Sequence, residues 1–516
     1  MRIFSLPTWA AFWLACSAGL SGAAHDSAPD TRADDARGPQ IGRLSFGWAS
    51  VDITPEEPVA VAGQYHARIT DEVDDRLTAT ALAIETHNHH GAIDQAVLVS
   101  CDLAVIRTML QQKVRKLVAL RLPDLDVQKI VLCATHTHTA PSITDITQDH
   151  HPYDFMGMWA YRIPEEGVMR PARYVEFLAQ RLAKAVVDAW GNRGEGSVSW
   201  ALSYAVVGHN RRAVYADKRA VMYGDANDPN FSHIEGPSDP TMDLLFFWNR
   251  DKEISGMVIA VPCPAQEVEG RRSMSADFWH DVRAALRKRY GADLPVLALC
   301  GASGDQSPHL LLNKKADARL RSRRQLERRK AIAAEIERGV ELVWEDARCD
   351  RHSELVFQHH VSALPLPVRE VTDARYEQAL ADYEAGKHRT AQLKDVDFMK
   401  WRVSRALVAR HKHQQRDPYY SAEIHVLRLG DVAIATNPFE LFLDYGLRIK
   451  ARSPAEQTFV VQLAADGGGY VPTERAVQGG GYSARIDDGV VGPAGGKVLV
   501  DHTVQTIREM WMEFPP

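Results

Sequence analysis

Six short apolar runs of the sequence each end in polar side chains that are able to ligate a metal ion or to transfer a proton. The first run is followed by Asp102, and the second is followed by His136 and His138. The other four endings are residues 263–267, 301–309, 437–440 and 466–470. Because α/β enzymes build their sites at the carboxyl ends of buried strands, these six endings predict one shared functional site.

His136 and His138 give the strongest local signal. Side chains two residues apart in an extended strand project to the same side, so these two histidines are predicted to face one metal ion or one substrate. The alternative is a pair of hydrogen-bonded histidines at a sheet edge. The flanking threonines and the strand-end position favour a functional pair. The spacing leaves open which histidine binds a metal.

The segment 301–309 combines glycines with Asp305, Ser307 and other polar residues. It lacks the Gly-Lys-Ser/Thr ending of a phosphate-binding P-loop, and residues 301–304 are one residue short of a nucleophile elbow. By themselves these residues favour a plain glycine turn. Glu440 precedes a helix that is expected to begin near Leu441, where a carboxylate serves either a site or the helix dipole.

The six apolar runs also define the fold class. Runs of this length without alternation predict strands that are buried on both faces. The apolar residues of segment 174–190 recur at three- and four-residue steps, which predicts a helix. We therefore expect an α/β fold with mixed sheets flanked by helices. The six runs are residues 96–100, 130–134, 256–261, 294–299, 431–436 and 459–463.

Charge and composition limit the class of protein. The 516 residues are 45% hydrophobic and 25% charged, with a formal net charge of only -6, which is typical of a globular protein. There is no basic excess to support nucleic-acid binding, so no nucleic-acid partner is expected. Two charged stretches, near 314–345 and 373–414, are predicted to be solvated helical insertions, and the alternative of a nucleic-acid arm in the first is disfavoured by nearby acidic residues.

The N-terminal residues predict export. Arg2 precedes an apolar stretch that ends in small residues, so residues 1–24 are interpreted as a signal peptide and residues 25–40 as a disordered tether. We therefore expect the protein to be periplasmic or secreted, and to have no stable membrane span once the signal peptide is cleaved. Lipoprotein attachment through Cys16 is the less favoured alternative. Five cysteines remain, and this odd number leaves at least one thiol free or liganded.

Several segments together resemble the neutral, non-lysosomal ceramidase family. Residues 47–55 (GWASVDITP) are similar to that family's opening strand and turn, and residues 134–141 (ATHTHTAP) to its histidine motif. Residues 304–308 (GDQSP) are similar to its serine-bearing loop, and residues 208–212 and 480–500 extend the likeness. The resemblance covers the chain from residue 41 to 516, in order, and implies one ceramidase-like catalytic domain.

The resemblance implies roles for individual residues. His136 and Glu440 are implied to bind zinc, His138 to lie beside the reacting group, and Ser307 to be the active-site serine. Asp305 and Glu267 are further catalytic candidates from the strand-end residues themselves. In this family zinc activates water and polarises an amide carbonyl.

The sequence also departs from the family pattern. Cys263 stands where the family has its second zinc histidine, and a thiolate is able to replace it. Where the family has a zinc-binding tyrosine, this chain has glycines 467–469, with Asp466 and Tyr470 as nearby substitutes, and we assign Asp466. The family's C-terminal β-sandwich domain has no counterpart before Pro516.

These observations favour an exported zinc-dependent hydrolase that cleaves an amide bond in an N-acyl lipid or related conjugate. One alternative is a carbohydrate-active enzyme on the same fold, in which Glu267, Glu440 or Asp305 supplies acid and base. A non-catalytic binding protein is the other alternative. Small-molecule, lipid and glycan substrates therefore all remain open, and Trp159, Tyr161, Trp279 and His280 are candidates for pocket walls.

Overall fold

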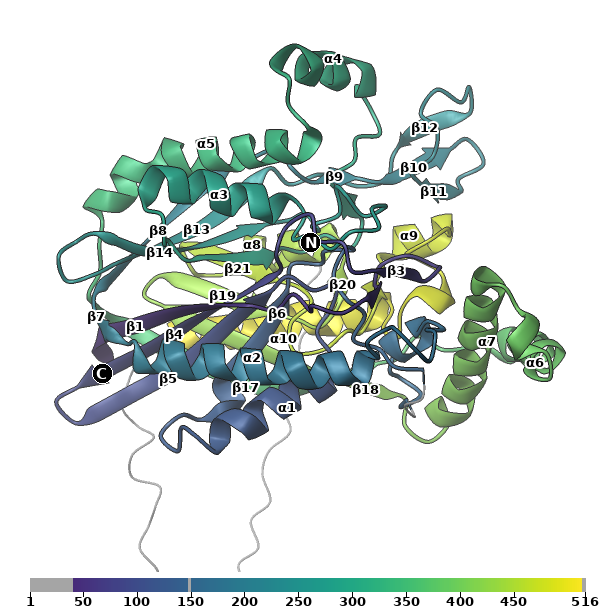
Figure 1. Ribbon diagram of the computed structural model, residues 1–516, viewed down its shortest axis with the longest axis horizontal. Coiled ribbons are helices and arrows are strands. Elements are labelled where there is room, and N and C mark those ends of the chain that lie inside the picture. The colour runs from purple at the N-terminus through teal and green to yellow at the C-terminus, as the bar shows by residue number, and fades with distance from the viewer. Residues whose placement is uncertain (1–39, 147–149, 513–516) are drawn as a thin grey trace, which may run out of the picture. The chain divides into compact units, whose positions relative to one another are not determined.

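The computed structural model describes residues 40–146 and 150–512. The predicted signal peptide lies outside these residues, as does the predicted tether apart from Gln40. The described residues are built mainly from two β-sheets with helices on their outer faces, as Figure 1 shows. Every helix of the described residues is too short or too polar to span a membrane.

The described residues form a nine-stranded mixed sheet with the order β21-β19-β18-β17-β1-β4-β5-β6, and β7 beside β1. Most neighbours are antiparallel, whereas β5–β6 and β19–β21 are parallel. The strands are β1 Ile41–Asp52, β4 Thr78–Asn88, β5 Gly91–Cys101, β6 Ile130–Ala134, β7 Gly194–Glu195, β17 Glu354–Pro367, β18 Tyr419–Leu429, β19 Val432–Thr436 and β21 Gln457–Val461.

A second sheet packs against the first. Its order is β15-β14-β13-β8, from β8 Ser197–Tyr204, β13 Thr241–Trp248, β14 Ile254–Val261 and β15 Val296–Cys300. Side chains of both sheets, including Phe46, Leu98, Phe247 and Leu297, form one buried apolar cluster between them. Each of the six apolar runs lies wholly or mostly in a strand of these sheets, so the predicted mixed α/β fold is confirmed.

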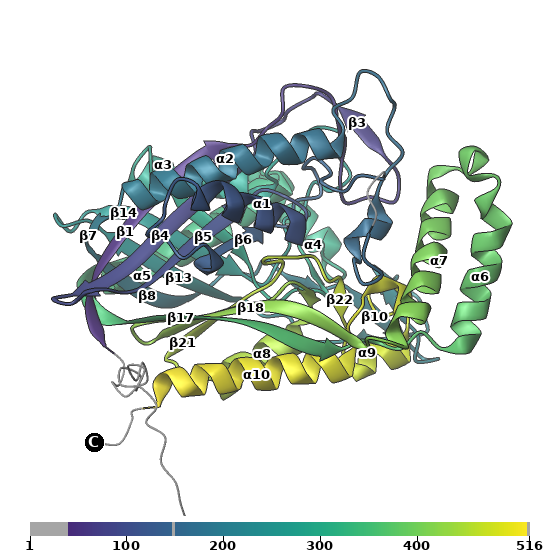
Figure 2. The ribbon, with the colours of Figure 1, turned by 90° about the horizontal axis from the view of Figure 1, so that it is seen from below.

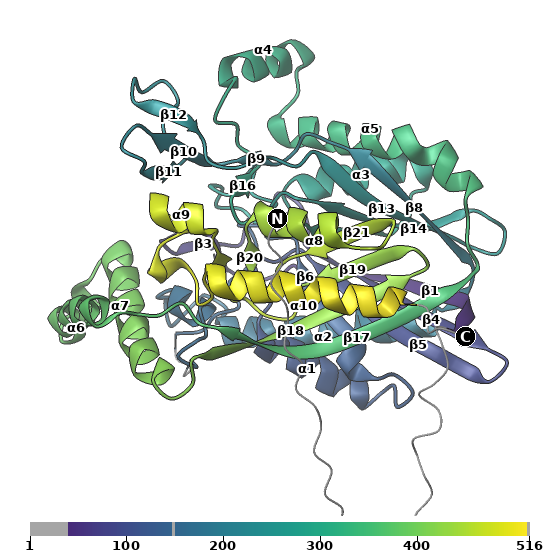
Figure 3. The ribbon, with the colours of Figure 1, turned by 180° about the vertical axis from the view of Figure 1, so that it is seen from behind.

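Helices cover the outer faces (Figures 1 and 2). Helices α1 (Thr108–Ala119) and α2 (Pro171–Gly191) pack on the β1-β4-β5-β6 part of the large sheet, and α2 matches the predicted helix at 174–190. Helices α3 (Phe278–Tyr290) and α5 (Arg328–Cys349) cover the second sheet. Helices α8 (Leu443–Arg452) and α10 (Pro493–Trp511) cover the β17-β18-β19-β21 part, as Figure 3 shows from behind.

The two charged stretches are helical, as predicted, but they differ in their packing. Residues 314–345 form α4 (Lys314–Arg324) and most of α5, and α5 buries Ile332, Ile336 and Val340 against the second sheet. The expectation of one solvated insertion is therefore wrong for α5, because its apolar residues recur at four-residue steps. Residues 373–414 form the hairpin of α6 (Asp373–Lys387) and α7 (Asp395–Gln414).

Backbone hydrogen bonds tie the ends of the parallel strands together. The Ala134 amide donates to Leu463 O at 3.1 Å, and the Gln462 amide donates to Cys300 O at 3.0 Å. The Asn437 amide donates to Val461 O at 2.9 Å. The segments that follow β6, β15, β19 and β21 therefore start from the same region, as the sequence predicted.

Candidate active site

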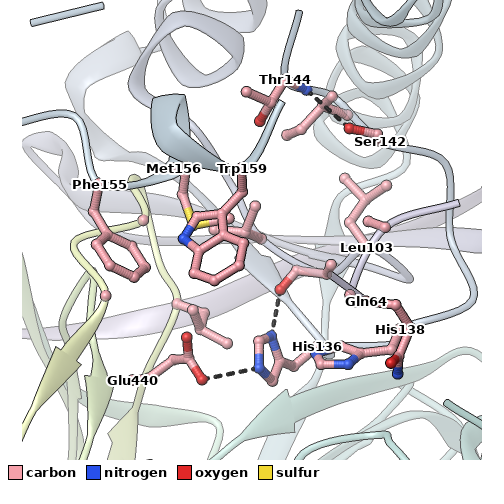
Figure 4. Close-up of a pocket in the computed structure, with 18 of the residues that line it drawn as sticks. Gln64, Leu103, His136, His138, Ser142, Thr144, Phe155, Met156, Trp159 and Glu440 are labelled. Carbon is pink, nitrogen blue, oxygen red and sulfur yellow. Dashed lines mark hydrogen bonds and ion pairs between the residues drawn. The ribbon is translucent and has the colours of Figure 1, made fainter. Parts of the chain in front are cut away.

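A cavity of about 860 Å³, counting its open mouth, lies beyond these strand ends. Its walls are mostly apolar and aromatic, and Figure 4 shows His136 and Glu440 at one side with Phe155, Met156 and Trp159 across from them. Of the predicted wall residues, Trp159 and Tyr161 line it, whereas Trp279 is buried in the core under α3 and His280 is exposed. The aromatic lining residues are Tyr65, Phe155, Trp159, Tyr161, Tyr470 and Tyr482.

His136 reaches the cavity through an unusual backbone conformation. Strand β6 ends at Ala134, and His136 has a φ of 66°, in the left-handed region that non-glycine residues seldom adopt. Its ring meets that of His138 edge-on, with centroids 4.8 Å apart. The two histidines are therefore adjacent, as predicted, but the prediction of an extended strand through them is wrong.

The contacts of His136 place a proton on Nδ1 and set Nε2 against a carboxylate. Nδ1 lies within hydrogen-bond distance of Ala104 O, which is only an acceptor, so Nδ1 carries a proton. Nε2 lies 3.1 Å from Glu440 Oε2, and in the neutral ring it would present a lone pair to that carboxylate. Two electron-pair donors at this distance need a proton or a cation between them.

Tyr470 completes this group. Strand β20 (Glu440–Leu441) pairs in parallel with β22 (Tyr470–Val471), which sets Glu440 directly opposite Tyr470. Arg211, itself buried, donates to Tyr470 Oη at 3.1 Å and to Gly304 O at 2.9 Å. Burial by itself raises the pKa of Glu440, but His136, Tyr470 and Arg211 together bring that pKa below its ordinary value.

His138 also lines the cavity, but protein groups occupy both of its ring nitrogens. The Gln266 side-chain amide donates to Nε2 at 2.8 Å, and Nδ1 lies 3.3 Å from Glu269 Oε2. Burial lowers the pKa of His138 despite this carboxylate, so the ring is neutral. Gly63, with a φ of 95°, lies against the ring, and a Cβ at this position would come within 2.3 Å of it.

The side chains of Cys263 and Asp466 do not contact the pair formed by His136 and Glu440. The described residues contain no group of three or more His, Cys, Asp and Glu side chains that could hold a metal ion. The Cys263 thiol is buried among apolar residues and lies 3.4 Å from Pro264 O, and burial raises its pKa well above the usual range. Asp466 accepts from the Thr108 amide, at the start of α1, and from Tyr420 Oη.

Ser307 is fully buried and is not part of the cavity wall. It lies in the short strand β16 (Gln306–Ser307), which pairs with β9 (His209–Asn210). Among the described residues, its Oγ contacts Tyr223 Oη at 2.8 Å and accepts from the His309 amide at 3.0 Å. No histidine side chain of the described region bonds to it, so it lacks an adjacent base.

Comparison with known proteins identifies the architecture. No family model and no curated protein matches the sequence. The structure is similar to that of neutral ceramidase from Pseudomonas aeruginosa, with a TM-score of 0.61 and 15% identity, over 92% of this chain and 76% of that chain. The chain has the neutral ceramidase fold. A second solved structure, a ceramidase complexed with C2, has a TM-score of 0.62 and 15% identity, over 92% of this chain and 77% of that chain.

Within this ceramidase-like fold, the donors on the cavity wall fit a zinc ion. Histidine and carboxylate are common zinc ligands, and a ligating histidine typically donates its other ring N–H to a carbonyl, as His136 does to Ala104. The sequence offered Tyr470 as a substitute ligand but Asp466 was assigned instead, and Gln266 and Glu269 were given no role. An aromatic residue directly after a glycine run at a strand end was the available signal for Tyr470.

Asp305 has a structural role in the ceramidase-like fold. It accepts from the Leu443 amide, at the start of α8, at 2.9 Å and from Asn210 Nδ2 at 2.7 Å. It is buried and lies outside the cavity wall. Of the three carboxylates proposed for glycan cleavage, Glu267, Glu440 and Asp305, it is Glu440 that lines the cavity. The described residues therefore offer no pair of carboxylates there to act as acid and base.

The surroundings of Glu267 disfavour the ionised form of its carboxyl group. Burial raises its pKa from 4.5 to about 7, and His309 Nε2 lies 3.6 Å from its carboxylate. The folded protein therefore keeps this proton to a higher pH than the unfolded chain does, so ionisation of Glu267 destabilises the fold as pH rises from 4.5 toward 7. Glu269 differs, because its contacts with His138 outweigh burial and lower its pKa.

These opposite shifts predict opposite effects of two matched substitutions. At about pH 8, Glu267→Gln is expected to raise the free energy of unfolding by up to about 3 kcal/mol, and this gain should vanish toward pH 4.5. Glu269→Gln should lower it at pH 8, with a smaller loss in acid. Urea unfolding at both pH values measures the two effects. A gain for Glu267→Gln that is the same at both pH values would contradict the assignment.

Proposed function

We propose that this protein is a zinc-dependent hydrolase that cleaves an amide bond in an uncharged N-acyl lipid or related conjugate. The observation that carries the proposal is the position of His136 Nε2, 3.1 Å from the Glu440 carboxylate, on the wall of an aromatic cavity. The neutral ceramidase fold supports it. Zinc would be held by His136, Glu440 and Tyr470, the last in place of the proposed ligand Asp466.

The cavity wall supports an apolar substrate without formal charge. Among the described residues, its lining contains no Lys, Arg or Asp, and Glu440 is its carboxylate. An anionic substrate would bring a second negative charge to a buried carboxylate, which costs free energy. Large apolar and aromatic surfaces, in contrast, favour an acyl chain or another hydrophobic group.

Several residues of the chain would support the chemistry that zinc supplies. When bound, zinc would activate water and polarise the amide carbonyl. Ala104 O fixes the tautomer of His136, and Arg211 orients the Tyr470 phenol through its hydrogen bond. The aromatic side chains exclude bulk water around the reacting bond, which strengthens the polar interactions there.

Metal analysis together with a substrate panel tests this proposal. Purified protein should contain near-stoichiometric zinc, lose turnover with a chelator and recover it with added zinc. It should cleave uncharged N-acyl amino alcohols, including ceramide, in preference to N-acyl amino acids and oligosaccharides. Full activity of the metal-free protein would contradict zinc dependence. Glycan cleavage without amide cleavage would contradict the substrate class, and tight ligand binding without any turnover would favour a binding protein.

A further inference from the structure

Helix α4 is a cationic element on a protein whose formal net charge is -6. Its sequence, KKADARLRSRR, has six cationic residues and one acidic residue, Asp317. None of its residues is buried. Figures 1 and 3 show it standing clear of both sheets, beyond the end of α5. Its cationic residues are Lys314, Lys315, Arg319, Arg321, Arg323 and Arg324.

Intramolecular ion pairs leave most of this charge available. Asp317 pairs with Arg321 at 2.8 Å and with Arg328, in α5, at 2.9 Å. Within the described part of the chain, Arg319, Arg323 and Arg324 form no salt bridge, and all three are exposed. A helix that is polar on every side gains little from packing, so an external partner would add to its stability.

Exposed apolar side chains accompany these cations. Leu312, just before the helix, and Leu320, within it, are 47% and 48% exposed. Cationic residues attract the phosphates of anionic lipids, and adjacent leucines are able to enter the boundary between headgroups and acyl chains. Nucleic acid also attracts cations, but it offers the leucines no apolar environment.

We propose that α4 and Leu312 form a docking surface for an anionic lipid bilayer. The cations of α4 point to several sides of the helix, so the docking is mainly electrostatic, and the leucines add a smaller apolar contribution. The inference goes beyond the proposed catalytic function and does not depend on it, because it concerns binding alone.

Vesicle co-sedimentation of the full chain tests the proposal. Vesicles of phosphatidylcholine with about one-third phosphatidylglycerol should bind the protein, pure phosphatidylcholine vesicles should bind it far less, and high salt should release it. The triple variant Arg319→Gln, Arg323→Gln, Arg324→Gln should lose about tenfold or more in apparent affinity. Leu320→Ser should cause a smaller loss whose size changes little with salt over the range in which binding is still measurable.

A matched triple variant separates this site from general charge attraction. Lys252→Gln, Lys288→Gln and Lys400→Gln remove three exposed cations from other elements and should leave vesicle binding within about twofold of the unmodified protein. Because all six substituted residues are exposed, both triple variants should keep the circular dichroism and thermal midpoint of the unmodified protein. Equal losses in the two triple variants would overturn the proposal, as would binding to double-stranded DNA but not to anionic vesicles.

Discussion

Replacement of Glu440 by Gln should lower kcat/KM by about a thousandfold or more and should remove most of the bound zinc. Glutamine has nearly the same shape, but it lacks the negative charge that faces His136 Nε2 at 3.1 Å. Loss of a residue that only orients a metal ligand typically costs ten- to a hundredfold. The expected effect is larger because Glu440 is itself assigned as a ligand. Steady-state kinetics and elemental analysis of the same preparation measure both losses.

Asp466→Asn is the matched control for this substitution. Asp466 is the nearby carboxylate that bonds to the Thr108 amide and to Tyr420 rather than to His136. The variant should therefore keep its zinc and retain kcat/KM within about tenfold of the unmodified protein. If Asp466→Asn loses zinc while Glu440→Gln keeps it, the proposed ligand set is wrong and Asp466 is the ligand.

The predictable part of the fold consists of continuous apolar runs and of the segment at 174–190 with its helical period. The runs at 130–134 and 256–261 are continuous apolar strands because both faces of their sheets are covered. The long antiparallel strands β17 and β18 were not predicted, since their burial alternates irregularly along the chain. The order of the strands in the sheet could not be predicted from the sequence either, because β17 pairs with β1 across more than three hundred residues of chain.

The candidate site was predictable where a residue lies within a few residues of the end of a buried strand. His136 and Glu440 meet this condition, and the structure brings them together. Tyr470 and Asp466 could not be distinguished by spacing, because positive φ values at Ala465, before Asp466, and at Gly469, before Tyr470, turn the chain sharply. The pairing of Glu440 with Tyr470 is a property of the folded backbone. Cys263 was placed by counting along the chain, which gave no information on where its thiol points.

Asp102, the first of the strand-end residues, predicts a large effect on stability. Its carboxylate, fully buried at the end of β5, accepts from Arg283 Nη1 at 2.6 Å and Nη2 at 3.0 Å, and from the Thr78 amide at 2.9 Å. Arg283 lies in α3, so the pair joins the end of β5 in the large sheet to the helix that covers the second sheet. Asp102→Ala should lower the free energy of unfolding by about 3–5 kcal/mol, because it leaves a buried guanidinium unpaired. Denaturant-induced unfolding measures this loss.

The double variant Asp102→Ala, Arg283→Met separates the buried charge from the lost contacts. Methionine fills part of the arginine's volume without a charge, so the double variant should recover most of the stability that Asp102→Ala loses. Thr135 Oγ1 lies 3.4 Å from Asp102 and precedes His136 in the chain. Zinc binding should therefore weaken in both variants, even where stability is restored. A double variant as unstable as Asp102→Ala would mean that the hydrogen bond to Thr78, rather than the ion pair, carries the stability.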